Sequence, residues 1–288
     1  MKLEQHVTSP GTLLPFLFEA FAEVKKTKVR QWLKHGAVQV NGRAITKFDH
    51  TLKPGDKIAI RPQKKPVEEL SPLPPGLKIL HEDDTLLVVE KPAGWLTIAK
   101  DSGKGRNIYS VLMDHVRSVT PKLRVWIVHR LDRETSGLIV FAKTEEAKRH
   151  LQQNWQDFEK RYLAITEGIP AKKEGTFCSH LDESNPLRVY SAPSSEDTRE
   201  AITHYRVLKT GQGRALIELD LETGRRHQIR VQLSDARCPV LGDLRYGSKN
   251  DPAKRLALHS SQLIFQHPED GRTMRFDSPL PKNLAELI

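Results

Sequence analysis

Two patterns of hydrophobic positions recur along the chain. Short apolar segments rich in β-favouring residues lie between polar turns, and they predict strands at residues 77–81, 86–89, 125–128, 137–141 and 215–221. Apolar side chains at helical spacing predict a helix over residues 107–116, and a second helix is expected after Thr144, a residue suited to the N-cap. Together these elements predict a mixed α and β domain dominated by antiparallel strands.

The first sixty residues form a separate pattern. Residues 29–36 predict a short amphipathic helix that ends at a glycine, and residues 37–40 follow as a strand. The pair Asn41-Gly42 predicts a tight hairpin turn, and a second turn at Pro54-Gly55-Asp56 leads into a strand at 57–60. Five prolines between residues 62 and 76 then disfavour helix and central-strand geometry. We therefore expect a module at 1–62, a linker at 63–76 and a large domain at 77–288.

The charge of the chain is concentrated in this N-terminal part. The net charge is +10, and the segment from Lys25 to Arg61 carries ten basic and two acidic residues, or +8 of that total. A basic surface of this kind attracts a phosphate backbone over long range, although a solvated lysine-rich face has the same composition. An anionic partner is therefore expected, and its main electrostatic contact is expected in the N-terminal module.

Composition excludes several other classes. No apolar run approaches the length of a membrane span and the first residues lack a basic-then-apolar leader, so we expect a cytoplasmic protein without membrane association. Cys178 and Cys238 are too few for a disulfide framework or a four-ligand zinc site, and they are expected to be free thiols. Neither a Walker loop nor a GxGxxG motif is present, so no nucleotide cofactor is expected.

The polar run at residues 129–138 connects two of the predicted strands. It places Asp132 near a strand end between Arg130 and Arg133. A carboxylate with an ordinary pKa near 4 is anionic at neutral pH, so Asp132 is a candidate nucleophile or base. The alternative is structural: Asp132 caps a turn, and the two arginines pair with it at the surface.

Two further clusters are candidates on the same grounds. A helix beginning just after Gly224 would place His227 and Arg230 on one face, opposite an apolar face that packs on the sheet. In a strand opened by Lys160, alternation sends Tyr162 to the face opposite its two neighbours, where it can stack on a base or simply pack. The structural alternatives are a stripe of surface ion pairs for the helix and core packing for the tyrosine. Residues 91–94 are interpreted as a plain turn.

Taken together, these clusters resemble the RluA-type family of RNA pseudouridine synthases. The motifs that support this resemblance occur in the order typical of the family across most of residues 77–288. The first module resembles the small alpha-L RNA-binding motif found in a ribosomal protein. The motifs are Lys-Pro-Ala-Gly at 91–94, His-Arg-Leu-Asp-Arg-Glu-Thr-Ser-Gly-Leu at 129–138, Lys-Arg-Tyr-Leu-Ala at 160–164, Gly-Arg-Arg-His-Gln-Ile-Arg at 224–230, Pro-Val-Leu-Gly-Asp at 239–243, Leu-Ala-Leu-His at 256–259, and Val-x-Val-Asn-Gly at 38–42.

The resemblance implies an α+β fold: a pseudouridine synthase domain with a long, bent, mainly antiparallel sheet and flanking helices, plus a small α/β N-terminal module. It implies isomerisation of uridines in structured RNA to pseudouridine without metal or cofactor, on ribosomal RNA by preference and transfer RNA as the alternative. Asp132 corresponds to the essential catalytic residue, by covalent attack or by sugar-proton abstraction, with Tyr162 and Arg230 beside it. Arg130 corresponds to a residue that takes the space of the displaced base. We also expect RNA contacts from His129, Arg133, Lys25, Lys26, Lys28, Arg30, Lys34 and Arg43, and a monomer.

Two departures and two rival functions remain open. Arg226 stands where many relatives have threonine and Cys238 where many have histidine, which puts transfer of substrate identity in doubt. A non-catalytic RNA-binding or ribosome-assembly protein would keep the fold without the chemistry. A hydrolytic glycosidase would use Asp132 with Glu134 as two carboxyls and would release free base.

Overall fold

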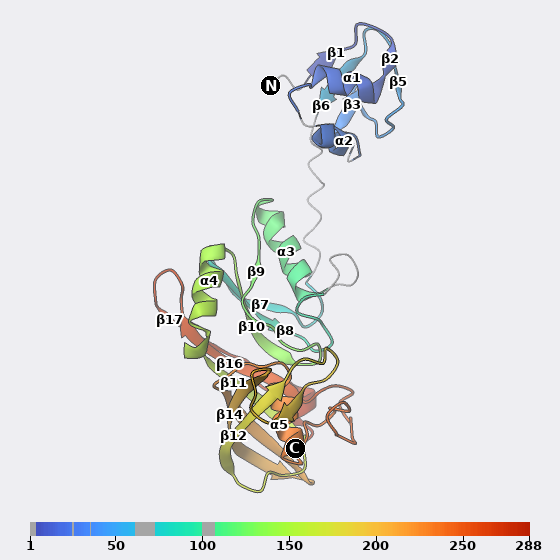
Figure 1. The fold of residues 1–288 in the computed structure, drawn as a ribbon. Coiled ribbons are helices and arrows are strands. Elements are labelled where there is room, and N and C mark those ends of the chain that lie inside the picture. The colour runs from blue at the N-terminus through green and yellow to red at the C-terminus, as the bar shows by residue number, and fades with distance from the viewer. Residues whose placement is uncertain (1–3, 25, 35, 61–72, 100–106) are drawn as a thin grey trace. The chain divides into compact units, whose positions relative to one another are not determined.

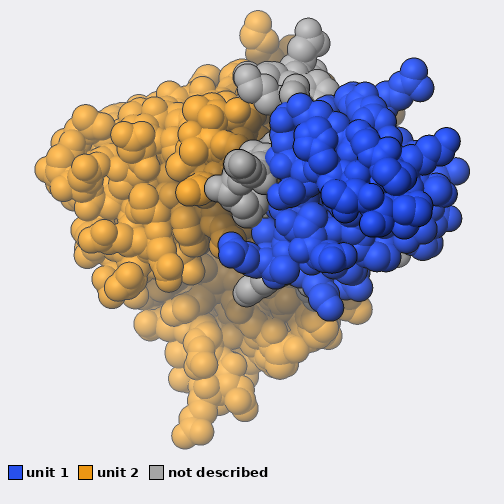
Figure 2. All heavy atoms as spheres, turned by 90° about the horizontal axis from the view of Figure 1, so that it is seen from above, with its two compact units in different colours: residues 1–71 blue, residues 72–288 orange. Residues whose placement is uncertain are grey.

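The chain is organised as two compact units. The computed structural model describes residues 4–24, 26–34, 36–60, 73–99 and 107–288, and it separates residues 1–71 from residues 72–288 (Figure 2). Of the predicted linker, residues 63–72 lie outside the described residues. In the part of the chain that is described, no helix is both long and apolar enough to cross a membrane.

The N-terminal unit packs two helices on small antiparallel sheets. Its turn at Asn41 and Gly42 has positive φ at both residues (50° and 83°), as a two-residue hairpin requires, so the predicted hairpin is confirmed. One helix begins three residues earlier than predicted, and the other was not predicted. The elements are a sheet in the order β1 (Glu4–His6), β6 (Lys57–Ile60), β3 (Val38–Val40) and β4 (Arg43–Ala44), the pair β2 (Gly11–Thr12) and β5 (Thr51–Leu52), and the helices α1 (Leu13–Ala20) and α2 (Lys26–Lys34).

The second unit is built on one eleven-stranded sheet (Figure 1). Its path runs β13-β12-β14-β15-β11-β16-β10-β8-β7, with β17 paired to β16 and β9 paired to β10. All neighbours are antiparallel except β10 and β16, so the expected mainly antiparallel sheet is confirmed. The strands are β7 (Lys78–Glu82), β8 (Leu86–Lys91), β9 (Trp126–Ile127), β10 (Ser136–Ala142), β11 (Glu159–Glu167), β12 (Glu174–Asp182), β13 (Tyr190–Ala192), β14 (Thr198–Gly211), β15 (Arg214–Leu221), β16 (Leu258–Gln266) and β17 (Thr273–Asp277).

Two helices cover opposite faces of this sheet at β8 and β10. Alternate residues of β8 explain the arrangement: Leu87 and Val89 pack with helix α3 (Ile108–Val119), whereas Leu86 and Val88 pack with helix α4 (Glu145–Gln153). The predicted cap of α4 is confirmed, because the Thr144 side chain accepts a hydrogen bond from the backbone of Ala147. The strands β8 and β10 are therefore buried on both faces and form a rigid base. The remaining helices are η1 (Trp155–Asp157), α5 (Gln228–Asp235) and α6 (Lys282–Ala285).

Helix α5 begins later than predicted. The expected start was just after Gly224, but the helix starts at Gln228, because His227 has a left-handed backbone (φ 55°). The Gln228 side chain accepts hydrogen bonds from the Arg225 backbone and from Thr223, at 2.9 and 2.8 Å, and so holds a turn ahead of the helix. His227 consequently projects from this turn and not from the helix.

The parallel pair β10 and β16 depends on a glycine. Gly137 has φ 111°, and a Cβ atom there would lie 2.1 Å from the Ser260 carbonyl oxygen. Beside it, the Ser136 hydroxyl contacts Nδ1 of the buried His259 at 2.9 Å. Only glycine permits this close approach, which brings the segment before β10 next to β11 and β16.

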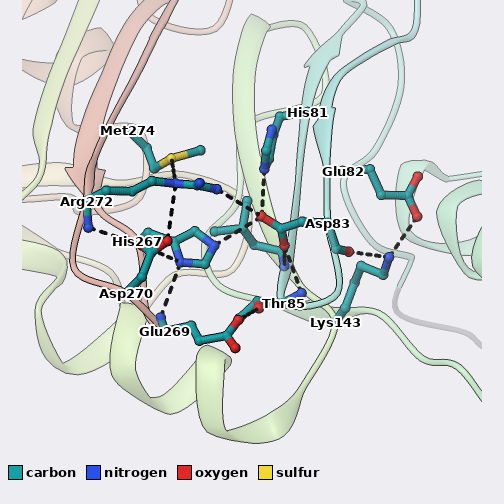
Figure 3. A network of polar contacts seen from close by, with 11 residues as sticks. His81, Glu82, Asp83, Thr85, Lys143, His267, Glu269, Asp270, Arg272 and Met274 are labelled. Carbon is teal, nitrogen blue, oxygen red and sulfur yellow. Dashed lines mark hydrogen bonds and ion pairs between the residues drawn. The ribbon is translucent and has the colours of Figure 1, made fainter.

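A polar network joins the hairpin of β7 and β8 to the hairpin of β16 and β17 (Figure 3). The Asp83 carboxylate accepts two backbone hydrogen bonds, from Thr85 and Leu86, and contacts His81 at 2.7 Å. From the hairpin of β16 and β17, His267 reaches the same carboxylate at 3.1 Å. These contacts outweigh the effect of burial and hold the pKa of Asp83 well below its usual range. The network therefore fixes the start of β8, whose other end lies under the site described next.

Candidate active site

One cavity of about 590 Å³ brings the three predicted clusters together in the second unit. The segment before β10 contributes Asp132, strand β11 contributes Tyr162, and helix α5 contributes Arg230. These residues are far apart in the sequence, and the sheet is what places them on one hollow. A cavity of this volume is in the range that holds a small ligand.

The charged centre of the cavity is a chain of carboxylate, guanidinium and carboxylate. Arg230 donates to both oxygens of Asp243, at 2.7 and 2.9 Å, and its remaining amino group donates to Asp132 at 3.0 Å. Burial alone lowers the pKa of Arg230, but the two carboxylates raise it further than burial lowers it. Asp243 is 1% exposed, whereas Asp132 is 21% exposed. The expected pairing of Arg230 with Asp132 is therefore present, and of the two carboxylates Asp132 is the one that lines the cavity.

Tyr162 supplies a neutral aromatic ring. Burial, with a smaller contribution from the charge of Asp132, raises the pKa of Tyr162 to about 12, although a hydrogen bond with Ser260 acts in the opposite direction. The phenol is therefore protonated at neutral pH. Its neighbours Arg161 and Leu163 line a different hollow, so the predicted alternation along the strand is confirmed.

The loop that carries Asp132 is held from beneath by residues 91–97. The buried Lys91 ammonium donates to three carbonyls, those of Pro92, Trp95 and Arg133, at 3.1, 2.9 and 3.2 Å. Thr97 exchanges two hydrogen bonds with the backbone of Leu131. The prediction of a plain turn at 91–94 therefore missed a support that fixes the residues on both sides of Asp132.

Burial also changes the chemistry of Lys91. Loss of hydration lowers the pKa of Lys91 to about 7, and the charges of Asp132 and Glu134 oppose that shift. The residue interacts with the Asp132 carboxylate electrostatically while its hydrogen bonds all go to the backbone. Lys91 therefore supports the structure of the loop that carries Asp132.

The other predicted residues of the loop differ in what they can offer. His129 accepts a hydrogen bond from the Val140 backbone and lies 4.4 Å from the Trp155 ring, and burial lowers its pKa to about 3, so its imidazole is neutral. Arg133 donates to the Gly94 carbonyl at 3.1 Å and lies 3.5 Å from Glu134. Arg130 is exposed at the cavity and forms no hydrogen bond or ion pair with the described residues. The guanidinium of Arg130 is therefore available to a ligand.

Two cavity residues, Trp155 and Lys160, were not predicted as site residues, whereas His227 was a candidate on the predicted helix face. Trp155 and Lys160 form one wall, where the Lys160 ammonium donates to the Trp155 carbonyl at 3.0 Å. His227 lies 3.7 Å from Asp132, and burial lowers its pKa despite that carboxylate. Trp155 matched the helical spacing of the apolar residues after Thr144. Only its position well beyond that N-cap residue indicated another role.

The predicted N-terminal contacts belong to the other unit. Lys26, Arg30 and Arg43 are exposed, and the first two lie over the Phe18 ring at 5.6 and 5.3 Å. Lys25 and the side chains of Lys28 and Lys34 are outside the described residues.

Comparison with known proteins identifies the family of the chain. Residues 85–235 match the family model described as RNA pseudouridylate synthase, and residues 13–58 match the S4 domain. The chain is 33% identical to an uncharacterized RNA pseudouridine synthase, YlyB, of Bacillus subtilis, over 95% of this chain and 91% of that protein. It is 33% identical to the ribosomal large subunit pseudouridine synthase D of Neisseria meningitidis serogroup A, over 96% and 78%.

A solved structure shows the same fold. The human RNA pseudouridylate synthase domain containing 4 has a TM-score of 0.60 and 26% identity, covering 72% of this chain and 90% of that one. The expected fold class and enzyme class are both confirmed by these matches. The chain therefore belongs to the RluA-type family of RNA pseudouridine synthases, with an S4 domain ahead of its catalytic domain.

Proposed function

We propose that this enzyme modifies uridines of ribosomal RNA and that Asp132 is its essential catalytic carboxylate. The observation that carries the assignment is the position of Asp132, which is the exposed end of the chain through Arg230 to the buried Asp243. Two of the similar proteins are named for the ribosomal large subunit, which supports ribosomal RNA over transfer RNA as the substrate.

The cavity supplies each group that the isomerisation needs. The reaction breaks the bond between N1 of uracil and C1′ of ribose and forms a bond from C5 to C1′, while the C5 proton is lost and N1 gains a proton. The target nucleotide leaves its stack to reach Asp132, which attacks it covalently or takes a sugar proton. Tyr162 offers an uncharged face for the ring, and the free Arg130 is placed to fill the space that the base leaves in the RNA.

The test compares Asp132→Asn with Glu134→Gln, a matched change in the same loop at a carboxylate whose ion pair among the described residues is with the exposed Arg133. With an unmodified ribosomal RNA transcript, we expect Asp132→Asn to lose turnover by on the order of 10⁴-fold or more while RNA affinity is kept. Glu134→Gln should retain wild-type turnover. Full activity of Asp132→Asn would remove Asp132 from the mechanism.

Two further measurements separate the alternatives. Pseudouridine maps of total RNA from cells with and without the protein identify the substrate, and new positions only in transfer RNA would refute the ribosomal assignment. Release of free uracil from the transcript would indicate hydrolysis by a glycosidase instead of isomerisation.

A further inference from the structure

The loop between β12 and β13, residues 183–189, is held beside the cavity by Arg226 together with Arg245 and Tyr246. We call it the rim loop. Arg226 donates through its guanidinium to three carbonyls of this loop, those of Glu183 at 3.2 Å, Pro186 at 3.1 Å and Asn185. The backbone amide of Arg226 also donates to the Glu183 carboxylate at 2.7 Å. Both Arg226 and Glu183 line the cavity, so the anchor lies beside the reacting groups.

A second set of contacts joins the rim loop to the catalytic arginine. Arg245 donates to the Leu187 carbonyl at 2.8 Å, and the Tyr246 hydroxyl accepts from the Val189 backbone at 2.9 Å. The same hydroxyl contacts His227 at 2.8 Å, and the Arg230 guanidinium lies 4.9 Å from the centre of the Tyr246 ring. The position of the rim loop is therefore fixed relative to Asp132.

The rim loop and the segment next to it expose large apolar and basic residues that are not part of the core. The Leu187 side chain is 73% exposed, and Leu244, next to Arg245 on the adjoining segment, is 67% exposed. Arg188, next to Leu187 in the chain, and Arg225, which lines the cavity, are also exposed. A cationic surface suits the phosphates of an RNA strand, and an exposed aliphatic side chain suits the face of an unstacked base. Glu183 of the rim loop and Arg225 both line the cavity, so an RNA strand whose target uridine enters the cavity can contact the loop as well.

We propose that Arg226 is a positioning residue and that Leu187 packs against the base next to the flipped uridine. The rim loop then helps to determine which sequence context the enzyme accepts. This inference rests on the proposed function, because it requires an RNA substrate in the cavity. Arg226 affects RNA through the loop, since three carbonyls already accept hydrogen bonds from its guanidinium.

The first test is Leu187→Ser, with Val119→Ser as the control. Val119 is 71% exposed at the end of α3 and does not line the cavity. On an unmodified RNA transcript that the wild type modifies, Leu187→Ser should raise KM about tenfold with kcat unchanged, and Val119→Ser should change neither. Two further substrates each lack the base at one of the two positions that flank the target. One of them should show a similar increase in KM with the wild type, and that increase should not add to the increase caused by Leu187→Ser.

The second test is Arg226→Lys, which keeps the charge but replaces the planar guanidinium, whose two amino groups reach the three carbonyls, by a single ammonium of different geometry. Hydrogen exchange of the rim-loop amides should become faster, and KM should rise as in Leu187→Ser while kcat is kept. Unchanged exchange, or a loss of kcat with KM unchanged, would overturn the role of Arg226. The base contact would be overturned if the KM increases from Leu187→Ser and from base removal were fully additive at both flanking positions. An effect of Leu187→Ser that is seen only on ribosomal particles and not on bare RNA would also overturn it. Absence of pseudouridine with the wild type would instead refute the proposed function.

Discussion

Arg230 shows how two carboxylates can share one cation and still differ in behaviour. The buried Asp243 takes two of its donors, and the planar guanidinium then fixes the direction of the third. Asp132 meets that third donor at 3.0 Å and keeps part of its surface in the cavity. The cation beside the proposed catalytic carboxylate is therefore in place before any RNA binds.

Some site residues were predictable and others were not. Asp132, Tyr162 and Arg230 lie in motifs with fixed spacing, so a resemblance could locate them. Lys91 sits in a Pro-Gly turn, where an exposed lysine is the usual expectation, and one of its three acceptors, the Arg133 carbonyl, is 42 positions away. Arg226 likewise acquires its role from carbonyls about 40 positions away, and side-chain pattern alone does not encode them.

At the same scale, His259 predicts a pH dependence of stability. Burial lowers the pKa of His259 to about 4 from its ordinary value near 6.5. Between these values the unfolded chain binds a proton that the folded protein excludes, so the free energy of unfolding falls as pH drops from 6.5 to 4. Urea unfolding should show wild type losing up to about 3 kcal/mol more than His259→Gln across this window. Parallel curves for the two proteins would contradict the assignment.

The local hydrophobic pattern predicted whether an element is a helix or a strand better than it predicted where the element begins and ends. The strands and both flanking helices of β8 and β10 follow from periodicity, because each face of those strands has its own set of apolar partners. The start of α5 depends on the Gln228 side chain, which closes a turn by hydrogen bonds and leaves no mark in the hydrophobic pattern. The parallel pairing of β10 with β16 joins residues more than a hundred positions apart, which periodicity does not reveal.

That pairing predicts a severe effect of Gly137→Ala. The added Cβ would meet the Ser260 carbonyl oxygen at 2.1 Å and the Ser260 nitrogen at 2.7 Å, in a backbone conformation that already favours glycine. We expect a loss of more than about 3 kcal/mol in urea unfolding. Gly213→Ala is the control, because Gly213 also has positive φ (72°) but open space around its Cβ, and it should lose only about 1 kcal/mol. Equal losses would show that backbone conformation, and not the close approach, makes glycine necessary.

For the whole molecule, the division of labour between the two units is the main expectation. The sequence predicted a boundary near residue 62 from charge and proline content, and the structure separates the units at 71 and 72. The S4 domain match covers residues 13–58, within the part that holds most of the net positive charge. We expect this unit to supply affinity and the second unit to supply chemistry.

A chain beginning at Pro72 tests this division. It keeps the cavity and its supporting sheet, so kcat should stay near the wild-type value. KM for RNA should rise, and the slope of log affinity against log salt should become shallower, because fewer phosphates are neutralised. Asp132→Asn in the full-length chain serves as the control for binding without turnover. An unchanged KM and salt slope would show that the N-terminal unit does not contact the substrate.

The contact between Arg230 and Asp132 joins positions 98 residues apart in the chain. During synthesis at about 5–20 residues per second, Asp132 leaves the ribosome roughly 5–20 s before its partner does. From the proposed roles of Asp132 and Arg230, we expect the nascent chain to be inactive until α5 and the segment carrying Asp243 have emerged. By then strands β7 to β15 are already available to support the loop that carries Asp132.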